Sequence, residues 1–106
     1  MDCIIVDDDS AARLIIRQLC KTTSKLVVVD EFSSAIDAIK YLNENSVDVV
    51  FLDIHMPSFS GFDFLKTITS SAKIILTTSD KNFALEAFEY TNVVDYLLKP
   101  VSKQRF

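Results

Sequence analysis

Five short apolar segments, each rich in β-branched residues, recur along the 106-residue chain. They are continuous rather than alternating, which predicts strands covered on both faces, as in a parallel sheet. These segments are residues 3–6, 26–29, 49–52, 74–76, and 93–94 together with 96–98.

Between the apolar segments the hydrophobic period becomes helical. The first predicted helix carries apolar residues at i, i+3, i+4, i+7 and i+8, and the second repeats part of this pattern. A third helix is predicted from Gly61 to about Ser70 and a fourth over residues 82–90. The apolar positions of the first two are Ala12, Ile15, Ile16, Leu19 and Cys20, then Ala35, Ala38, Ile39 and Leu42.

Polar residues mark where these helices begin. Ser10 is the predicted cap of the first helix, while Ser34-x-x-Asp37 and Ser60-x-x-Asp63 have the spacing of capping boxes. Strands and helices then alternate through one α/β domain, residues 1–106, without a second domain. Right-handed crossovers place helices on both faces of an open, doubly wound sheet. A fifth helix is expected after Pro100-Val101-Ser102, and we expect it to be missing or truncated here.

Composition excludes several classes of function. An apolar fraction of 49% and a charged fraction of 25% are typical of a folded globular protein. Gly61 is the only glycine, so no glycine-rich phosphate loop can be written. The net charge of −4 argues against nucleic-acid contact by this domain itself. No apolar run approaches the roughly 20 residues that span a bilayer, so we expect a cytoplasmic domain without membrane contact.

The two cysteines, Cys3 and Cys20, each sit among aliphatic residues. There is no C-x-x-C motif and no histidine at ligand spacing. We therefore interpret them as two buried free thiols in a reducing cytosol rather than as a disulfide or a metal site.

Candidate chemistry gathers at the predicted carboxyl ends of the strands, where open α/β sheets place their sites. If the first and third strands are neighbours, Asp7, Asp8 and Asp53 converge in one crevice. Three carboxylates repel one another, and Mg²⁺ is the natural compensating cation because it prefers oxygen ligands. Lys99, after the fifth strand, adds positive charge beside Asp53, and Thr78 offers a hydroxyl to a phosphoryl oxygen. Asp53 is then the candidate nucleophile, forming an acyl phosphate.

Taken together, these motifs resemble the receiver domain of two-component response regulators across the entire chain. The segment that includes Ala84 to Glu89, followed by Val94 to Val101, is similar to the LytTR-type (LytR/AlgR) subgroup. Ser58 departs from the family pattern, because glycine is common at that position. The matching segments are residues 4–9, 47–57, 60–62, 75–79 and 95–100.

The resemblance implies a flavodoxin-like, doubly wound, five-stranded parallel sheet in the order 2-1-3-4-5. It also implies that Asp53 accepts a phosphoryl group from the phosphohistidine of a sensor histidine kinase. Asp8 and Asp53 would bind Mg²⁺ directly with the backbone carbonyl of His55, and Asp7 through water. Such a protein is a phosphoacceptor, not a free-turnover enzyme: it catalyses only its own phosphorylation and slow dephosphorylation.

The same resemblance implies a switch and an output. Lys99 would hold the phosphoryl group, Thr78 would move toward it, and Tyr96 would change rotamer on the fourth-helix and fifth-strand face. In the LytTR subgroup a DNA-binding domain usually follows and controls transcription. A homodimer through the fourth-helix and fifth-strand face is expected for that subgroup, but the sequence leaves it undetermined.

Several alternatives stay open at this point. Asp7 and Asp8 are also compatible with an acidic cap on the first helix, and Thr77 competes with Thr78 as the hydroxyl donor. Tyr96 also suits a plain core position, and the side chain of His55 suits a loop. Two other functions remain: a phosphorylation-independent interaction module, and an aspartyl-phosphate hydrolase of the haloacid-dehalogenase type. The latter needs a second aspartate where this chain has His55.

Overall fold

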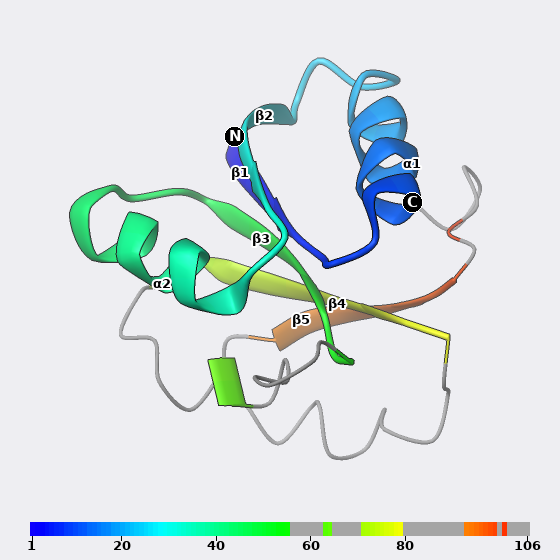
Figure 1. Cartoon of the computed structure of the whole chain (residues 1–106). Coiled ribbons are helices and arrows are strands. Elements are labelled where there is room, and N and C mark those ends of the chain that lie inside the picture. Colours follow the sequence, from blue (N-terminus) through cyan, green and yellow to red (C-terminus); the bar gives the residue numbers. More distant parts are fainter. Residues whose placement is uncertain (56–62, 65–70, 80–92, 100, 102–106) are drawn as a thin grey trace.

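The computed structural model describes residues 1–55, 63–64, 71–79, 93–99 and 101. All sheet contacts are parallel, and the strand order is β2-β1-β3-β4-β5 (Figure 1), which confirms the predicted order. The order reverses direction at β1, so β1 and β3 lie side by side although α1, β2 and α2 separate them in sequence. The strands are β1 (Asp2–Val6), β2 (Val27–Phe32), β3 (Val49–Asp53), β4 (Lys73–Thr78) and β5 (Val93–Leu98).

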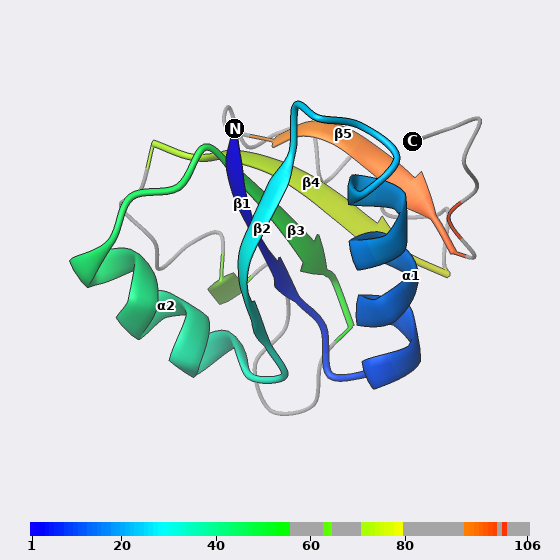
Figure 2. The same cartoon turned by 90° about the horizontal axis from the view of Figure 1, so that it is seen from above.

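Two helices cover opposite faces of this sheet, α1 (Ser10–Cys20) on one side and α2 (Ala35–Glu44) on the other (Figures 1 and 2). Each face has its own apolar cluster: Ile16 and Cys20 of α1 pack in one, and Ala35 and Ala38 of α2 in the other. The predicted third helix falls outside the described residues except for the helical pair Asp63 and Phe64, and the fourth falls outside entirely. No helix within the described ranges is long and apolar enough to cross a bilayer.

The cap of α1 differs from the prediction. Asp9, not Ser10, is the N-cap residue: its backbone is extended, and its carboxylate accepts a hydrogen bond from the backbone N of Ala11. Ser10 is already the first helical residue. At the start of α2, Ser34 occupies the predicted N-cap position but makes no side-chain cap hydrogen bond. Aspartate is as good an N-cap as serine, and its charge also favours the positive end of the helix dipole.

Strand β2 also differs from the prediction of strands covered on both faces. It is an edge strand, and Val27 and Val29 are 53% and 42% exposed. It also continues three residues past the predicted end, because Asp30 and Glu31 pair with Ile4 and Ile5 of β1. The central strand β3, in contrast, is buried along its whole length. The apolar pattern therefore located every strand but did not distinguish the edge from the centre.

Candidate functional site

Three carboxylates meet at the carboxyl edge of the sheet, where β1 and β3 are neighbours. Val6 pairs with Leu52, so Asp7 and Asp53 leave adjacent strands at the same level. Asp7 and Asp53 are buried, Asp8 is exposed, and one oxygen from each of the three lies within 4.8 Å of the others. The convergence expected from the sequence is therefore present.

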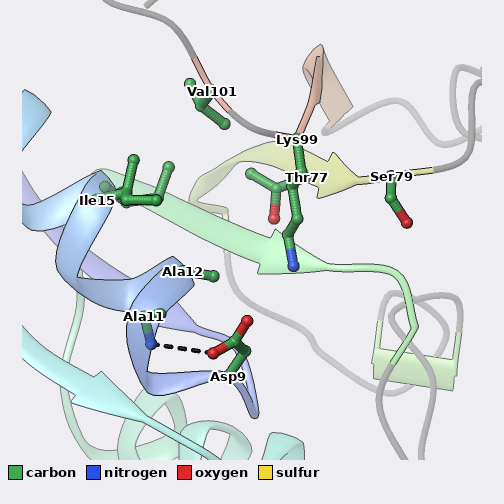
Figure 3. A pocket seen from close by; sticks show the side chains of 9 residues that line it. Asp9, Ala11, Ala12, Ile15, Thr77, Ser79, Lys99 and Val101 are labelled. Carbon is green, nitrogen blue, oxygen red and sulfur yellow. Dashed lines mark hydrogen bonds between the residues drawn. The ribbon is translucent and has the colours of Figure 1, made fainter.

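Lys99 joins this cluster from the end of β5. Its Nζ lies 2.8 Å from Asp7 Oδ2 and 3.6 Å from Asp53 Oδ1. Figure 3 shows its side chain extending from the end of β5, past Thr77, toward the start of α1. The sequence placed Lys99 beside Asp53, and the structure adds a shorter contact with Asp7. One ammonium group thus forms ion pairs with two buried carboxylates.

Backbone hydrogen bonds fix the residues that carry these side chains. The backbone N of Asp7 donates to Phe32 O at 3.0 Å, and that of Lys99 donates to Thr78 O at 2.7 Å. Ile54 N, next to Asp53, donates to Thr77 O at 3.1 Å. Each bond extends the hydrogen-bond ladder of the sheet beyond the end of a strand. The sheet therefore holds the backbone of these site residues in place.

The electrostatics of the pair Asp53 and Lys99 follow from crowding in a buried place. Burial and the charge of Asp7 together raise the pKa of Asp53 to about 6, although Lys99 and the hydrogen bond from the His55 backbone act in the opposite direction. Burial alone lowers the pKa of Lys99, but its hydrogen bond to Asp7 and the two carboxylate charges leave that pKa raised. Lys99 therefore stays charged. The positive charge around Asp53 is too small to offset the cost of ionising its buried carboxyl group.

This donor set suits a small, hard divalent cation. Mg²⁺ binds oxygen at about 2.1 Å, so two of its ligands are at most about 4.2 Å apart. The carboxylate oxygens of Asp7, Asp8 and Asp53, all within 4.8 Å of one another, need little movement to reach that spacing. Exposed Asp8 also leaves one side of the cluster open to water, and Mg²⁺ usually keeps several of its waters.

His55 and the hydroxyl residues surround the cluster. The backbone N of His55 donates to Asp53 Oδ1 at 3.2 Å, which brings the His55 backbone beside Asp53 while its side chain is exposed. Thr77 and Thr78 end β4 next to β3, and both are buried. Thr77 lines a pocket together with Lys99. Position near the cluster therefore does not decide which of the two threonine hydroxyls would contact a phosphoryl oxygen. Tyr96 on β5 is partly buried against the cluster of apolar residues on the α2 face.

A group that the sequence did not single out supports Asp7 from behind. Arg13 Nη1 donates to the backbone O of Asp7 at 2.7 Å, and Arg13 Nε lies 3.5 Å from Glu31 Oε1. Arg17, one turn further along α1, pairs with the same Glu31 carboxylate. The available signal was a pair of arginines four residues apart facing a charged residue in a strand, but β2 was predicted to end before Glu31.

A pocket of about 340 Å³ adjoins the carboxylate cluster on the α1 side (Figure 3). Asp9, Thr77, Ser79 and Lys99 form its polar part, and Ala11, Ala12, Ile15 and Val101 belong to its apolar part. Lys99 therefore lies between this pocket and the buried carboxylates.

Comparison with known proteins places this geometry in a family. The model of the response regulator receiver domain matches residues 3–106. The chain is 36% identical over 107 residues to an uncharacterized response regulatory protein of Vibrio cholerae, covering 99% of this chain and 45% of that protein. It is 37% identical over 108 residues to the transcriptional regulatory protein YpdB of Escherichia coli, covering 99% of this chain and 44% of that protein. The chain thus spans less than half the length of these curated relatives.

Solved structures agree. The response regulatory domain of protein MrkE from Klebsiella pneumoniae superposes with a TM-score of 0.88 at 36% identity, covering 99% of this chain and 88% of that one. The isolated receiver domain of RcsB from Salmonella enterica serovar Typhimurium, solved with phosphomimetic BeF₃⁻, gives a TM-score of 0.85 at 27% identity, covering 98% and 80%.

Proposed function

The chain belongs to the receiver-domain family of response regulators, and on that premise we propose that Asp53 is its phosphoacceptor. The phosphodonor is the phosphohistidine of a sensor histidine kinase, the usual partner of receiver domains. We place this reaction in the cytosol, with Mg²⁺ as the required cation. The chain phosphorylates and slowly dephosphorylates itself and has no free-turnover substrate.

One observation carries this proposal: at the carboxyl ends of the strands, the buried carboxylate of Asp53 lies close to two other carboxylates and to Lys99. Two like charges about 4 Å apart repel by roughly 4 kcal/mol at an effective dielectric constant near 20. A fold gains no stability from that arrangement, so its residues suit a ligand that brings positive charge. A bound cation and an incoming phosphoryl group together use every charged group of the cluster.

Each residue then has a chemical role. An Asp53 oxygen forms a bond to phosphorus while the bond from phosphorus to the histidine nitrogen breaks, and that nitrogen keeps the electron pair. Lys99 holds a phosphoryl oxygen, and the hydroxyl of Thr78 donates to another. Asp8, Asp53 and the backbone carbonyl of His55 would hold Mg²⁺ directly, and Asp7 through water. The bound cation supplies neutralising charge for the transferred group.

The signal leaves the site through β4 and β5. Thr78 pairs with Leu98, and two residues earlier Leu76 pairs with Tyr96. Thr78 and Tyr96 therefore lie on neighbouring strands, two residues apart in register. We propose that Tyr96 changes rotamer after phosphorylation and alters the fourth-helix and fifth-strand face, through which two copies pair. The fourth helix itself lies outside the described residues.

The output that we propose is transcription control through a LytTR-type DNA-binding domain. The relative YpdB is a transcriptional regulatory protein, and about half of its length lies outside the match with this chain. DNA contact would belong to such an additional domain, because the chain itself carries a net charge of −4.

The test is a Mg²⁺ titration followed by addition of acetyl phosphate. We expect NMR shifts at residues 7, 8 and 53 with Mg²⁺, and then a mass increase of one phosphoryl group. No response to Mg²⁺ and no phosphorylation would instead indicate an interaction module that keeps only the fold. Continuous turnover of phosphate esters would indicate a hydrolase and contradict the proposal.

A further inference from the structure

A β-bulge in strand β2 determines which way Glu31 faces. The register between β1 and β2 shifts by one residue just before Ile4, and beyond the shift Ile5 pairs with Glu31. Without the extra residue, Glu31 would pair with Val6 instead. Ile5 belongs to the apolar cluster on the α1 face, and Val6 belongs to the cluster on the α2 face. Because side chains alternate between the two faces of a strand, the bulge turns Glu31 toward α1.

Two arginines of α1 contact Glu31 on this face. Arg13 Nε lies 3.5 Å from Glu31 Oε1, and Arg17 contacts Oε2 through both Nε and Nη2. The side chains of Arg13, Glu31 and Arg17 are 20%, 22% and 37% exposed, so water screens these ion pairs only in part. Like charges four residues apart on a helix repel one another, and the carboxylate between them offsets that repulsion. Glu31 therefore holds both guanidinium groups in place between α1 and β2.

Arg13 connects Glu31 to Asp7. While its Nε faces Glu31, its Nη1 donates to the backbone O of Asp7 at 2.7 Å. The backbone N of Asp7 donates to the O of Phe32, the residue after Glu31, at 3.0 Å. The end of β2 thus holds the N–H of Asp7 directly and its C=O through Arg13.

The place of Asp7 sets the spacing of the whole carboxylate cluster. Its Oδ2 is 2.8 Å from Lys99 Nζ, and one of its oxygens lies within 4.8 Å of oxygens from Asp8 and Asp53. A shift of the Asp7 backbone would therefore change the distances between all of these charged groups. In addition, the guanidinium of Arg13, once released from its ion pair, could move to the neighbouring carboxylates and compete there with a divalent cation.

We propose that Glu31 is a positioning residue for the carboxylate cluster, which acts through Arg13 to hold Asp7 where the cluster can bind Mg²⁺. This inference rests on the proposed function, because it takes Mg²⁺ as the ligand of the cluster. Partners that hold metal ligands in place typically change metal affinity by about tenfold or more, and Glu31 is one contact further away. We therefore expect Mg²⁺ to bind about threefold to tenfold more weakly when the charge of Glu31 is removed.

The experiment is an NMR titration of the wild-type chain and its variants with Mg²⁺. Glu31→Gln removes the charge at constant size, and Glu31→Thr is a second uncharged variant with a residue that strands favour. Asp30→Asn is the matched control: it removes one charge from the adjacent residue, which pairs with Ile4 of the α2-face cluster. Asparagine can still accept the hydrogen bond that Asp30 Oδ1 accepts from the backbone N of Glu31. We expect weaker binding in both Glu31 variants and an affinity within about twofold of the wild type in the control.

A double variant, Arg13→Gln with Glu31→Gln, shows whether Glu31 acts through Arg13. If it does, the double variant binds Mg²⁺ as weakly as Arg13→Gln alone, whereas independent effects would multiply. Circular dichroism verifies that each variant is folded.

The inference would be overturned by multiplied effects, by wild-type affinity in the Glu31 variants, or by an equal loss of affinity in Asp30→Asn. Loss of folding in both Glu31 variants would show a purely structural residue and would overturn it too. All of these outcomes leave the proposed function intact, because the wild type still binds Mg²⁺. Absence of Mg²⁺ binding by the wild type would contradict the proposed function and this inference together.

Discussion

Lys99 lies closer to Asp7 than to Asp53, with its Nζ 2.8 Å from the first carboxylate and 3.6 Å from the second. A phosphoryl group on Asp53 therefore competes with Asp7 for the same ammonium group. Before phosphorylation, Lys99 is the positive charge that makes the carboxylate cluster tolerable. On the proposal that Asp53 is phosphorylated, Lys99 would then hold the phosphoryl group, and Asp7 would be left to the bound cation.

Replacing Lys99 with methionine should destabilise the cation-free protein more than the Mg²⁺-bound protein. The variant keeps the length of the side chain but removes the charge that faces two buried carboxylates. Because the lysine side chain is 24% exposed, we expect a loss of about 1–3 kcal/mol without Mg²⁺, below the full cost of breaking a buried ion pair. Urea unfolding with and without Mg²⁺ measures the difference. An equal loss in both conditions would show that Lys99 acts by packing alone.

Replacing Asp53 with asparagine should stabilise the cation-free protein at neutral pH. The pKa of Asp53 is raised from 3.8 to about 6 in the folded protein, so folding favours its protonated form. The stability that this shift provides is complete below about pH 4 and is lost as the pH rises through 6. Asparagine removes this loss, and we expect a gain of roughly 1–3 kcal/mol at pH 7.5.

The measurement is thermal or urea unfolding of both proteins between pH 3.5 and 7.5, with chelator present. The curves of free energy against pH should meet near pH 4, separate between about pH 4 and 6, and stay apart above 6. Curves that stay parallel between pH 4 and 6 would contradict an unfavourable Asp53 charge. Saturating Mg²⁺ should raise the stability of the wild type more than that of the variant.

Thr77 and Thr78 provide a matched pair for testing the switch. We expect Thr78→Ala to accept a phosphoryl group on Asp53 but to lose the response of Tyr96, because the variant lacks the hydroxyl that would move toward the phosphate. Thr77→Ala should keep that response. NMR of Tyr96 in the presence of BeF₃⁻ as phosphoryl analogue provides the measurement. If the two variants exchange these behaviours, the donor is Thr77.

Arg13 should tune cation affinity through Asp7. Arg13→Gln removes the donor to the backbone O of Asp7 and one ion pair with Glu31, whereas Arg17→Gln removes only a pair with Glu31. Supporting contacts of this kind typically change metal affinity by about tenfold or more. We therefore expect Mg²⁺ to bind about tenfold more weakly to the Arg13 variant and unchanged to the Arg17 variant. Equal affinities in calorimetric titration would remove Arg13 from the site.

Much of this architecture could be predicted because parallel sheets convert sequence order into position. Asp7, Asp53 and Lys99 each follow an apolar strand, and strands of one parallel sheet end at one edge. That rule also separates the carboxylates correctly from Cys3, which is at the start of the first strand. The resemblance to receiver domains then supplied the strand order, which the apolar pattern leaves open.

What could not be predicted depends on side chains that reach across elements. The choice of Asp9 over Ser10 as cap rests on one extended residue, and both types are good caps. The contact of Arg13 with Asp7 needs the rotation of α1 about its axis. The exposure of Val27 needs the knowledge that β2 is at the edge, which its own valine-rich sequence conceals.

Chemical trapping of an acyl phosphate identifies the phosphorylated side chain. The chain is incubated with Mg²⁺ and acetyl phosphate, the acyl phosphate is reduced with borohydride, and the modified peptide is sequenced by mass spectrometry. We predict homoserine at position 53 in the wild type and no modification in Asp53→Asn under the same conditions. Homoserine at position 7 or 8 instead, or undiminished labelling of the asparagine variant, would contradict Asp53 as the phosphoacceptor.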